Sequence, residues 1–357
     1  MTRHATIAGV GSSLPPRLVP NTWFEEIVET NDEWIRDRTG IEARHFADDG
    51  VQASDLAVEA ARAALESAGI TAEQLDMIVV ATITGDTVFP ATAVWVQRKL
   101  GVSCPSFDIN AACAGFSYGL STATAFITAG MADTILLIGA EVFSRILDFT
   151  DRGTCILFGD GAGAAVVRAS EVAGVEGSIL GADGNAAEIL WMPAGGTRTP
   201  ASAESVAANE HVVRMPNGRE VFKRAVTEMA SSCRDLLEKS GHTIDDVDVL
   251  IPHQANARIM TAVVDRLGID PAKAVVDVAE VGNTSAASIP VALDRAWRAG
   301  TIREGDLVLF TSFGAGLTWG ATLVRWTLAS PATLASSASS ASPASSASPA
   351  SSAEAGA

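Results

Sequence analysis

RAALESAGITAEQLDMIVVATIT (62–84) and RDLLEKSGHTIDDVDVLIPHQAN (234–256) align without gaps at a separation of 172 residues. Each segment has the pattern of an amphipathic helix closed by glycine, then a short turn and a buried strand. The identical pairs are Arg62 and Arg234, Leu65 and Leu237, Glu66 and Glu238, Gly69 and Gly241, Thr71 and Thr243, and Asp76 and Asp248. The chain therefore contains the same helix–strand unit twice.

A second pair of segments follows in the same order. CAGFSYGLSTATAFITAG (113–130) corresponds to NTSAASIPVALDRAWRAG (283–300) at a separation of 170, and each is followed by an apolar strand, at 133–141 and 305–314. A repeat of this length indicates a duplicated α/β half, because solenoid repeats are shorter. Chance similarity between helix–strand units is the alternative, and the shared order of elements argues against it.

The alternation of strands and helices predicts mixed or largely parallel sheets covered by helices. We expect one α/β half over 1–173 and a second over 174–328. The helices that start at Cys113 and Asn283 carry few charges in their first turns, so we expect both to be buried together between two sheets. Residues 329–357 are almost entirely Ala, Ser and Pro, a composition that predicts a disordered tail.

The composition of the chain excludes several classes of protein. Its 357 residues are 48% hydrophobic and carry a formal net charge of −17, so it is globular and repels nucleic acid and anionic membranes. No apolar stretch approaches the ~20 residues of a membrane helix, and MTRHATIAGVGSSLPP is not a secretory signal. Four cysteines without a CxxC pair make zinc and disulfides unexpected. We expect a cytoplasmic protein without metal.

Three side chains are candidates for chemistry. Cys113 begins a predicted helix, whose N–H groups and dipole favour the nucleophilic thiolate, although a lone cysteine is more often an inert core residue. His253 follows a buried strand of the second half, where sites assemble in α/β proteins, but it also suits a core position. Asn283 could serve as a helix cap. The duplication predicts equivalent helix starts for Cys113 and Asn283. The three residues together are therefore a stronger indication of a catalytic site than any one of them alone.

Two glycine-rich stretches are less specific. FGDGAGAAVV (158–167) lacks the spacing of a phosphate-binding loop, so we expect a tight turn entering a strand. The glycines of FGAGLTWGA (313–321) allow backbone amides to approach a ligand, which is one way to build an oxyanion hole.

Six motifs together resemble the β-ketoacyl-acyl-carrier-protein synthase III family of thiolase-fold condensing enzymes. They run in order from about residue 5 to 326: TNDEWIRDRTGIEARH (30–45), DINAACAGFSYGL (108–120), DRGTCILFGDGAGAAVV (151–167), PHQANARI (252–259), GNTSAAS (282–288) and FGAGLTWGATLVRW (313–326). The resemblance implies an α/β thiolase fold, with two duplicated halves in five αβαβα layers. It also implies a homodimer that initiates type II fatty-acid synthesis.

The resemblance assigns roles to the three candidates. Cys113 would take an acyl group from an acyl-CoA, which is a substrate and not a cofactor. Malonyl-acyl-carrier protein would then lose carbon dioxide and attack the acyl-enzyme, while His253 and Asn283 stabilise the thioester oxygen. The amides of Cys113 and Ala315 would hold the oxygen during acyl transfer. Phe313 would face the cysteine, and Phe89 would reach across the dimer to bound the partner's acyl pocket.

The resemblance also assigns the binding of the two substrates. Trp34 and Arg152 would sandwich the adenine of coenzyme A, Arg38 would meet a phosphate, and Asn256 would line the same tunnel. A basic patch would steer the acidic carrier protein, and it comprises Arg214, Lys223, Arg224 and Arg258. Core packing for the aromatic residues and a solvated charged face for the basic ones are the bland alternatives.

Some residues depart from the family's pattern. The glycine-rich loop reads GAGL, with Ala315 and Leu317, Arg219 replaces a smaller polar residue, and Asp265 replaces a basic one. These changes leave the starter acyl group and the carrier affinity open. A related enzyme of polyketide or secondary metabolism is the first alternative. A non-catalytic subunit is the second, but it would be expected to lose the nucleophile. A thiolase proper would need a cysteine near the C-terminus, and Cys233 is the last one.

Overall fold

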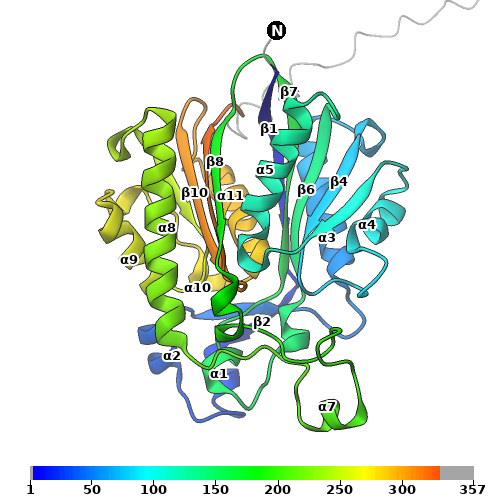
Figure 1. The fold of residues 1–357 in the computed structure, drawn as a ribbon, viewed down its shortest axis with the longest axis vertical. Coiled ribbons are helices and arrows are strands. Elements are labelled where there is room, and N and C mark those ends of the chain that lie inside the picture. Colours follow the sequence, from blue (N-terminus) through cyan, green and yellow to red (C-terminus); the bar gives the residue numbers. More distant parts are fainter. Residues whose placement is uncertain (1–2, 330–357) are drawn as a thin grey trace, which may run out of the picture.

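A computed structural model describes residues 3–329, and Figure 1 shows its helices and strands. The predicted disordered tail, apart from Ala329, lies outside the described residues. The strands form two large sheets and one small ribbon. The first sheet has the order β1 (His4–Ser13), β7 (Gly161–Ser170), β6 (Thr134–Glu141), β4 (Met77–Ala81) and β5 (Ser106–Ile109). The second has the order β8 (Val175–Ala182), β11 (Thr318–Arg325), β10 (Leu307–Gly314) and β9 (Val249–Pro252), and the ribbon pairs β2 (Arg17–Pro20) with β3 (Ala43–Phe46).

Both large sheets are mixed, and they repeat one topology. In the first, β4 runs parallel to β6, and β6 is antiparallel to β7, which is antiparallel to β1. In the second, β9, β10, β11 and β8 have the same relations in the same order. The predicted duplication and the predicted mixed sheets are therefore both confirmed.

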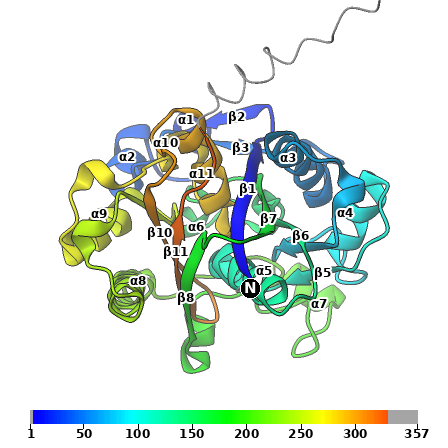
Figure 2. The same ribbon diagram turned by 90° about the horizontal axis from the view of Figure 1, so that it is seen from above.

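Helices complete five layers, which Figure 2 shows from above. The outer face of the first sheet is covered by α3 (Ala53–Ala68) and α4 (Thr92–Leu100), and that of the second by α8 (Gly218–Ser240) and α9 (Ala257–Leu267). Between the sheets lie α5 (Gly115–Thr128) and α11 (Ser288–Arg298). The short helices are α1 (Asn21–Phe24), α2 (Asp32–Thr39), α6 (Arg152–Cys155), α7 (Ala203–Ala207) and α10 (Val278–Val281). The 3₁₀ turns are η1 (Ala72–Gln74), η2 (Ala112–Ala114), η3 (Phe143–Ile146), η4 (Gly184–Ile189), η5 (Ile244–Asp246), η6 (Pro271–Lys273) and η7 (Ser285–Ala287).

Local sequence explains why the repeated unit folds the same way twice. Both α3 and α8 end at a glycine in the left-handed region, Gly69 with φ 64° and Gly241 with φ 73°, a conformation that costs glycine little. The turns that follow are closed by capping boxes, in which Thr71 and Thr243 begin η1 and η5. Each turn then leads into a buried strand, as the sequence predicts.

The central helices depart from the prediction in their register. Each is preceded by a 3₁₀ turn, and α11 has 11 residues against 14 in α5. Their C-terminal ends correspond at the predicted separation of 170, but their starts do not, so Cys113 lies within η2 while Asn283 precedes η7. The prediction of equivalent helix starts is wrong by three residues. Pro290 gives the reason, because proline is tolerated only in the first turn and α11 must begin just before it.

Candidate functional site

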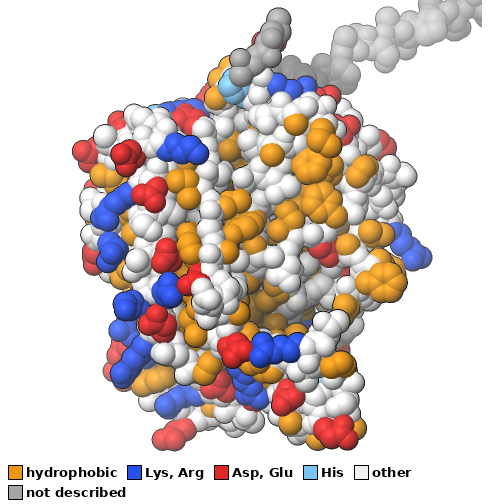
Figure 3. All heavy atoms as spheres, in the orientation of Figure 1, with side chains coloured by type: hydrophobic (Ala, Val, Ile, Leu, Met, Phe, Trp, Pro, Cys, Tyr) orange, Lys and Arg blue, Asp and Glu red, His pale blue; other side chains and the backbone are white. Residues whose placement is uncertain are grey.

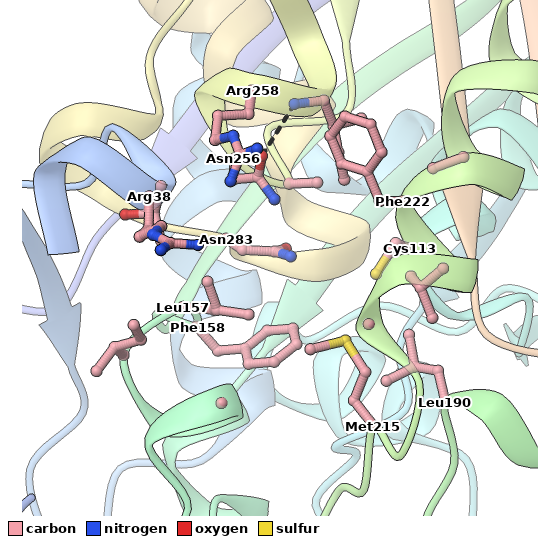
Figure 4. Close-up of a pocket in the computed structure, with 18 of the residues that line it drawn as sticks. Arg38, Cys113, Leu157, Phe158, Leu190, Met215, Phe222, Asn256, Arg258 and Asn283 are labelled. Carbon is pink, nitrogen blue, oxygen red and sulfur yellow. Dashed lines mark hydrogen bonds between the residues drawn. The ribbon is translucent and has the colours of Figure 1, made fainter. Parts of the chain in front are cut away.

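A cavity of about 690 Å³ opens between the two halves of the fold. Cys113, His253 and Asn283 line its inner end, together with Phe313, and in Figure 4 the sulfur of Cys113 and the amide of Asn283 point toward one another. A second cavity of about 330 Å³ begins on the other side of Cys113 and is mainly apolar. The three candidate residues, 170 positions apart at the extremes, therefore meet where two cavities join.

The backbone around Cys113 is closely packed. Ala112, which directly precedes it, has φ 46°, and Gly314 at the end of β10 lies against the same turn. A Cβ atom on Gly314 would come within 2.6 Å of the backbone nitrogen of Cys113, so a larger residue there would displace the turn. The second half of the chain thus fixes the position of the cysteine in the first.

The electrostatics of Cys113 differ from the prediction. Burial raises the pKa of its thiol to about 12, whereas a hydrogen bond with Ser285 and one from a backbone N–H act in the opposite direction. The thiol is consequently protonated at neutral pH. The prediction that its place at a helix start favours the thiolate is wrong, because the loss of hydration outweighs the stabilisation by neighbouring N–H groups.

His253 follows β9, and its Nδ1 faces the side chain of Ser288. Its Nδ1 lies 2.6 Å from the hydroxyl of Ser288, and that hydroxyl accepts a hydrogen bond from the backbone N–H of Gln254 at 3.4 Å. When the Ser288 hydroxyl donates its hydrogen to Nδ1, the imidazole hydrogen is on Nε2. Burial also lowers the pKa of His253 to about 3, so the ring is neutral. It can act as an uncharged hydrogen-bond donor.

Asn283 has an equally defined orientation. Its backbone forms an isolated bridge with Phe158, and its Oδ1 accepts a hydrogen bond from the backbone N–H of Ser285 at 2.9 Å. Because the oxygen is engaged in this bond, the Nδ2 amide group is the end presented to the cavity. His253 and Asn283 thus supply two neutral donors beside the cysteine.

The mouth of the larger cavity is cationic and aromatic. The guanidinium carbon of Arg152 lies 4.6 Å from the ring centre of Trp34, and that of Arg38 lies 5.6 Å from it. Asn256 lines the same cavity and caps α9, since its Oδ1 accepts from the N–H of Ile259 at 2.9 Å. A ligand with phosphates and a planar base would find both partners here.

The predicted basic patch is smaller than its sequence suggests. Arg214 pairs with Asp148 at 2.6 Å, and Arg224 pairs with Asp183 at 3.1 Å, so internal acids compensate both charges. Lys223 and Arg258 are exposed and form no ion pair within residues 3–329. In Figure 3, basic and acidic side chains alternate along the edge formed by α8 and α9.

The remaining predicted residues are dispersed. Ala315 lines the smaller cavity, and Leu317, two residues farther along the chain, is fully buried. Arg219 lines the larger cavity, and Asp265 lies with Arg258 on a shallow depression outside it. Phe89 lines neither cavity and is 86% exposed, so a single chain gives it no partner there.

Sequence reasoning missed three residues behind the site. Ser285 and Ser288 lie within GNTSAAS, and Glu141 ends the apolar strand β6. A charged residue at the end of a buried strand could have drawn attention to Glu141. Within the described chain, no helix is long and apolar enough to cross a membrane, and no three His, Cys, Asp or Glu side chains form a metal-binding group.

Comparison with known proteins identifies relatives over nearly the whole described chain. The family described as 3-Oxoacyl-[acyl-carrier-protein (ACP)] synthase III matches residues 107–184, and its C-terminal region matches 237–326. A β-ketoacyl-acyl-carrier-protein synthase III of Caldanaerobacter subterraneus is 50% identical over 90% of this chain and 98% of the relative. One of Streptomyces coelicolor is 46% identical over 93% of this chain and all of the relative.

Solved structures agree with these sequences. The 3-oxoacyl-(acyl carrier protein) synthase III of Pseudomonas aeruginosa has a TM-score of 0.84 at 43% identity, over 92% of this chain and all of that one. The priming β-ketosynthase from the R1128 polyketide biosynthetic pathway has a TM-score of 0.86 at 35% identity, over 91% of this chain and 97% of that one.

Proposed function

Because this chain belongs to the β-ketoacyl-acyl-carrier-protein synthase III family and is a condensing acyltransferase, we propose that Cys113 carries the acyl group between its two substrates. The donor is an acyl-CoA with a short or branched acyl group, and the acceptor is malonyl-acyl-carrier protein. The observation that carries this assignment is the pair of oriented neutral donors, His253 and Asn283, on the cavity that contains the thiol.

In the first half-reaction, the sulfur of Cys113 attacks the thioester carbon of the acyl-CoA. A bond forms from this sulfur to the acyl carbon and the bond to the sulfur of coenzyme A breaks. The thiol of Cys113 gives up its proton to a base, and coenzyme A leaves as a thiolate that takes up a proton from solvent. The backbone amides of Cys113 and Ala315 stabilise the oxygen of the intermediate. The acyl chain occupies the smaller apolar cavity, while Trp34, Arg38, Arg152 and Asn256 bind the nucleotide end.

In the second half-reaction, the malonyl thioester enters the larger cavity and loses carbon dioxide. Negative charge develops on its thioester oxygen, and Nε2–H of His253 and Nδ2–H of Asn283 donate to that oxygen. The carbanion attacks the acyl carbon on Cys113 and the thiolate leaves. Neutral donors suit this step, since they bind the developing anion without first pairing with the malonyl carboxylate.

The assignment is tested by incubating the protein with a panel of acyl-CoAs and malonyl-acyl-carrier protein. We expect β-ketoacyl-carrier protein, carbon dioxide and free coenzyme A in equal amounts. Release of coenzyme A without a carbon–carbon bond would contradict condensation and would leave a simple acyltransferase or thioesterase.

Replacement of Ser288 by alanine should slow decarboxylation more than acylation. Without the hydroxyl, Nδ1 of His253 loses its partner, and the imidazole hydrogen no longer stays on Nε2. We expect decarboxylation of malonyl-carrier protein to fall about tenfold, less than the 10²–10³ typical for removing an oxyanion donor itself. Separate single-turnover assays of the two half-reactions measure the difference. An equal loss in both would indicate general damage to the site.

Charge reversal at Lys223 should weaken use of the acidic carrier protein. Lys223 is exposed on the second turn of α8 and lines neither cavity, whereas Arg258 lines the larger cavity and would affect both substrates. We expect Lys223→Glu to raise the KM for malonyl-carrier protein about tenfold at low salt, with less effect at high salt.

The matched control for this variant is Lys239→Glu. Lys239 is exposed near the other end of the same helix, about 24 Å farther along it. Its reversal should leave both KM values unchanged, and neither variant should slow acylation by acyl-CoA. If the two charge reversals had equal effects, the change in net charge would explain them, and docking of the carrier protein at Lys223 would be rejected.

Two further features belong to this proposal. A second copy of the chain covers Val88 and Phe89, which are 99% and 86% exposed on the loop between β4 and α4, and Phe89 then bounds the partner's acyl cavity. The exposure of two large apolar side chains on one loop supports such a homodimer, because a second copy would bury them. The enzyme acts in the cytoplasm and binds neither nucleic acid nor membrane.

Priming of a polyketide is the second candidate function. It is favoured by the likeness to the R1128 priming β-ketosynthase, and it would use the same residues and the same two half-reactions. The two candidates differ in the carrier protein served, so parallel assays with fatty-acid and polyketide carrier proteins distinguish them.

A further inference from the structure

Glu141 is a fully buried acid that the reaction described so far does not use. It is the last residue of β6, and its carboxylate accepts hydrogen bonds from the backbone N–H groups of Ile83 and Thr84 and from the Thr84 hydroxyl. A buried carboxylate costs several kcal/mol unless it is well paired. The hydrogen bonds from Ile83 and Thr84 therefore stabilise the ionised form of Glu141 in the interior.

Ser285 connects this acid to the nucleophile. Its hydroxyl donates to Oε1 of Glu141 at 3.1 Å, and the same side chain acts to lower the pKa of the Cys113 thiol. Ser285 has φ 50° in η7, which packs directly on the η2 turn that contains Cys113. The hydroxyl of Ser285 thus lies between the turn that carries the thiol and the carboxylate of Glu141, and neither Ser285 nor Glu141 lines a cavity.

We propose that Ser285 and Glu141 form a proton relay that stores the proton of Cys113 while the cysteine carries the acyl group. The inference rests on the proposed function of Cys113. As the sulfur attacks the acyl-CoA, its S–H bond breaks and the proton passes to the oxygen of Ser285. The hydroxyl proton of Ser285 passes in turn to Glu141, which becomes a neutral acid, and coenzyme A leaves as a thiolate that solvent protonates.

The second half-reaction returns the proton. The carbanion formed by loss of carbon dioxide displaces the thiolate of Cys113, Ser285 donates to this sulfur, and Glu141 donates to Ser285. The carboxylate and the thiol are then restored. No external acid or base is consumed at the cysteine, and the negative charge of the malonyl group replaces the one that left with coenzyme A.

The surrounding charges suit this relay. Burial raises the pKa of Glu141 to about 7, and hydrogen bonds from Thr84, Ile83 and Ser285 oppose the rise. Of the titratable groups on the elements packed around it, Cys113 interacts with its charge, while Asp160, just before β7, is bound by Ser144 and the N–H of Ala47. His253 lies beyond Cys113 and is engaged with Ser288. Ionised Glu141 can accept the proton, so acylation should slow as the pH falls through about 7.

The test follows acylation of Cys113 by an acyl-CoA in single turnovers between pH 6 and pH 8. In the wild type the rate should rise about tenfold across this range, as one group with a pKa near 7 requires. In Ser285→Ala and in Glu141→Gln the rate at pH 8 should fall at least about tenfold and lose this dependence, because the thiol then has no acceptor.

Two features of the chain separate the relay from structural damage. Alanine is tolerated at φ 46° in Ala112, so Ser285→Ala keeps a backbone conformation that the protein already uses. Ser117→Ala is the control, since it removes a buried serine hydroxyl from α5 that bonds Ser312 and not Glu141. It should keep the wild-type rate and pH profile.

The rates and pH profiles of Ser285→Ala and Glu141→Gln decide whether the relay operates. Variants that keep the wild-type profile, or that are slower with an unchanged pH dependence, would overturn the relay. Failure of the proposed function would look different, because the wild type would then form no acyl-Cys113 at any pH.

Discussion

The Cys113→Ala enzyme should lose acyl transfer completely yet still decarboxylate malonyl-carrier protein. No other group can form the thioester, so we expect condensation to fall by at least about 10⁴. His253 and Asn283 keep their orientation, since Ser288 and the backbone N–H of Ser285 hold them. Decarboxylation should therefore stay within a few-fold of the wild type, measured as carbon dioxide released in the absence of acyl-CoA.

The other buried cysteines provide the control for this variant. Cys104 is buried in the core of the first half and lines neither cavity, so Cys104→Ala should retain both activities. Acylation that persists in Cys113→Ala on another residue would contradict the assignment of the nucleophile. If Cys113→Ala lost decarboxylation as well as acylation, this would contradict the prediction that His253 and Asn283 support decarboxylation without the thiol.

Asn283→Asp should have the opposite effect on the two half-reactions. The substitution keeps the shape and the acceptor for Ser285, but it replaces the Nδ2 donor by a carboxylate oxygen beside the developing anion. We expect decarboxylation to fall by at least about 10²–10³, while acylation changes by a few-fold. Burial raises the pKa of such a carboxyl, so part of the activity should return as the pH falls and the protonated acid donates.

A distant substitution of the same kind controls for the added charge. Asn209→Asp introduces the same negative charge at an exposed position with φ 53°, a conformation that aspartate tolerates. It should leave both half-reactions unchanged. An equal loss of acylation and decarboxylation in Asn283→Asp would argue that Asn283 only maintains the fold of the site.

The sequence predicts the fold and the three central residues for identifiable reasons. The repeated helix–glycine–turn–strand unit depends on local signals, which can be recognised in a single sequence. These signals are the glycines at the helix ends, Gly69 and Gly241, and the capping boxes at Thr71 and Thr243. Cys113 follows β5 and His253 follows β9, and both residues line one cavity, as expected for side chains that follow strands in α/β proteins.

The errors of prediction have one local cause and two causes that depend on the folded chain. The alignment assumes equal helix lengths, whereas Pro290 shortens α11 and displaces Asn283 from the position equivalent to Cys113. The pKa of Cys113 depends on how far the surrounding chain removes water, and burial outweighs the local N–H groups. The pairing of Arg214 with Asp148 joins positions 66 residues apart, so the local sequence shows the positive charge but not its compensation.

The orientation of the donors is likewise invisible in the sequence. GNTSAAS contains both Ser285 and Ser288, but only the folded chain brings one backbone N–H to Oδ1 of Asn283 and one hydroxyl to Nδ1 of His253. These two contacts engage Nδ1 of His253 and Oδ1 of Asn283, which leaves Nε2 and Nδ2 for a ligand in the larger cavity. They are the part of the site that most directly determines its chemistry.

The most direct test of the account is a two-step experiment on the intact protein. The enzyme is first incubated with an acyl-CoA and freed of excess substrate, and its mass and proteolytic peptides are measured. Malonyl-carrier protein is then added. We predict one acyl group per chain on the peptide that contains Cys113, and its discharge into β-ketoacyl-carrier protein with one carbon dioxide. An acyl group on Cys104, Cys155 or Cys233, or an acyl-enzyme that malonyl-carrier protein fails to discharge, would contradict the account.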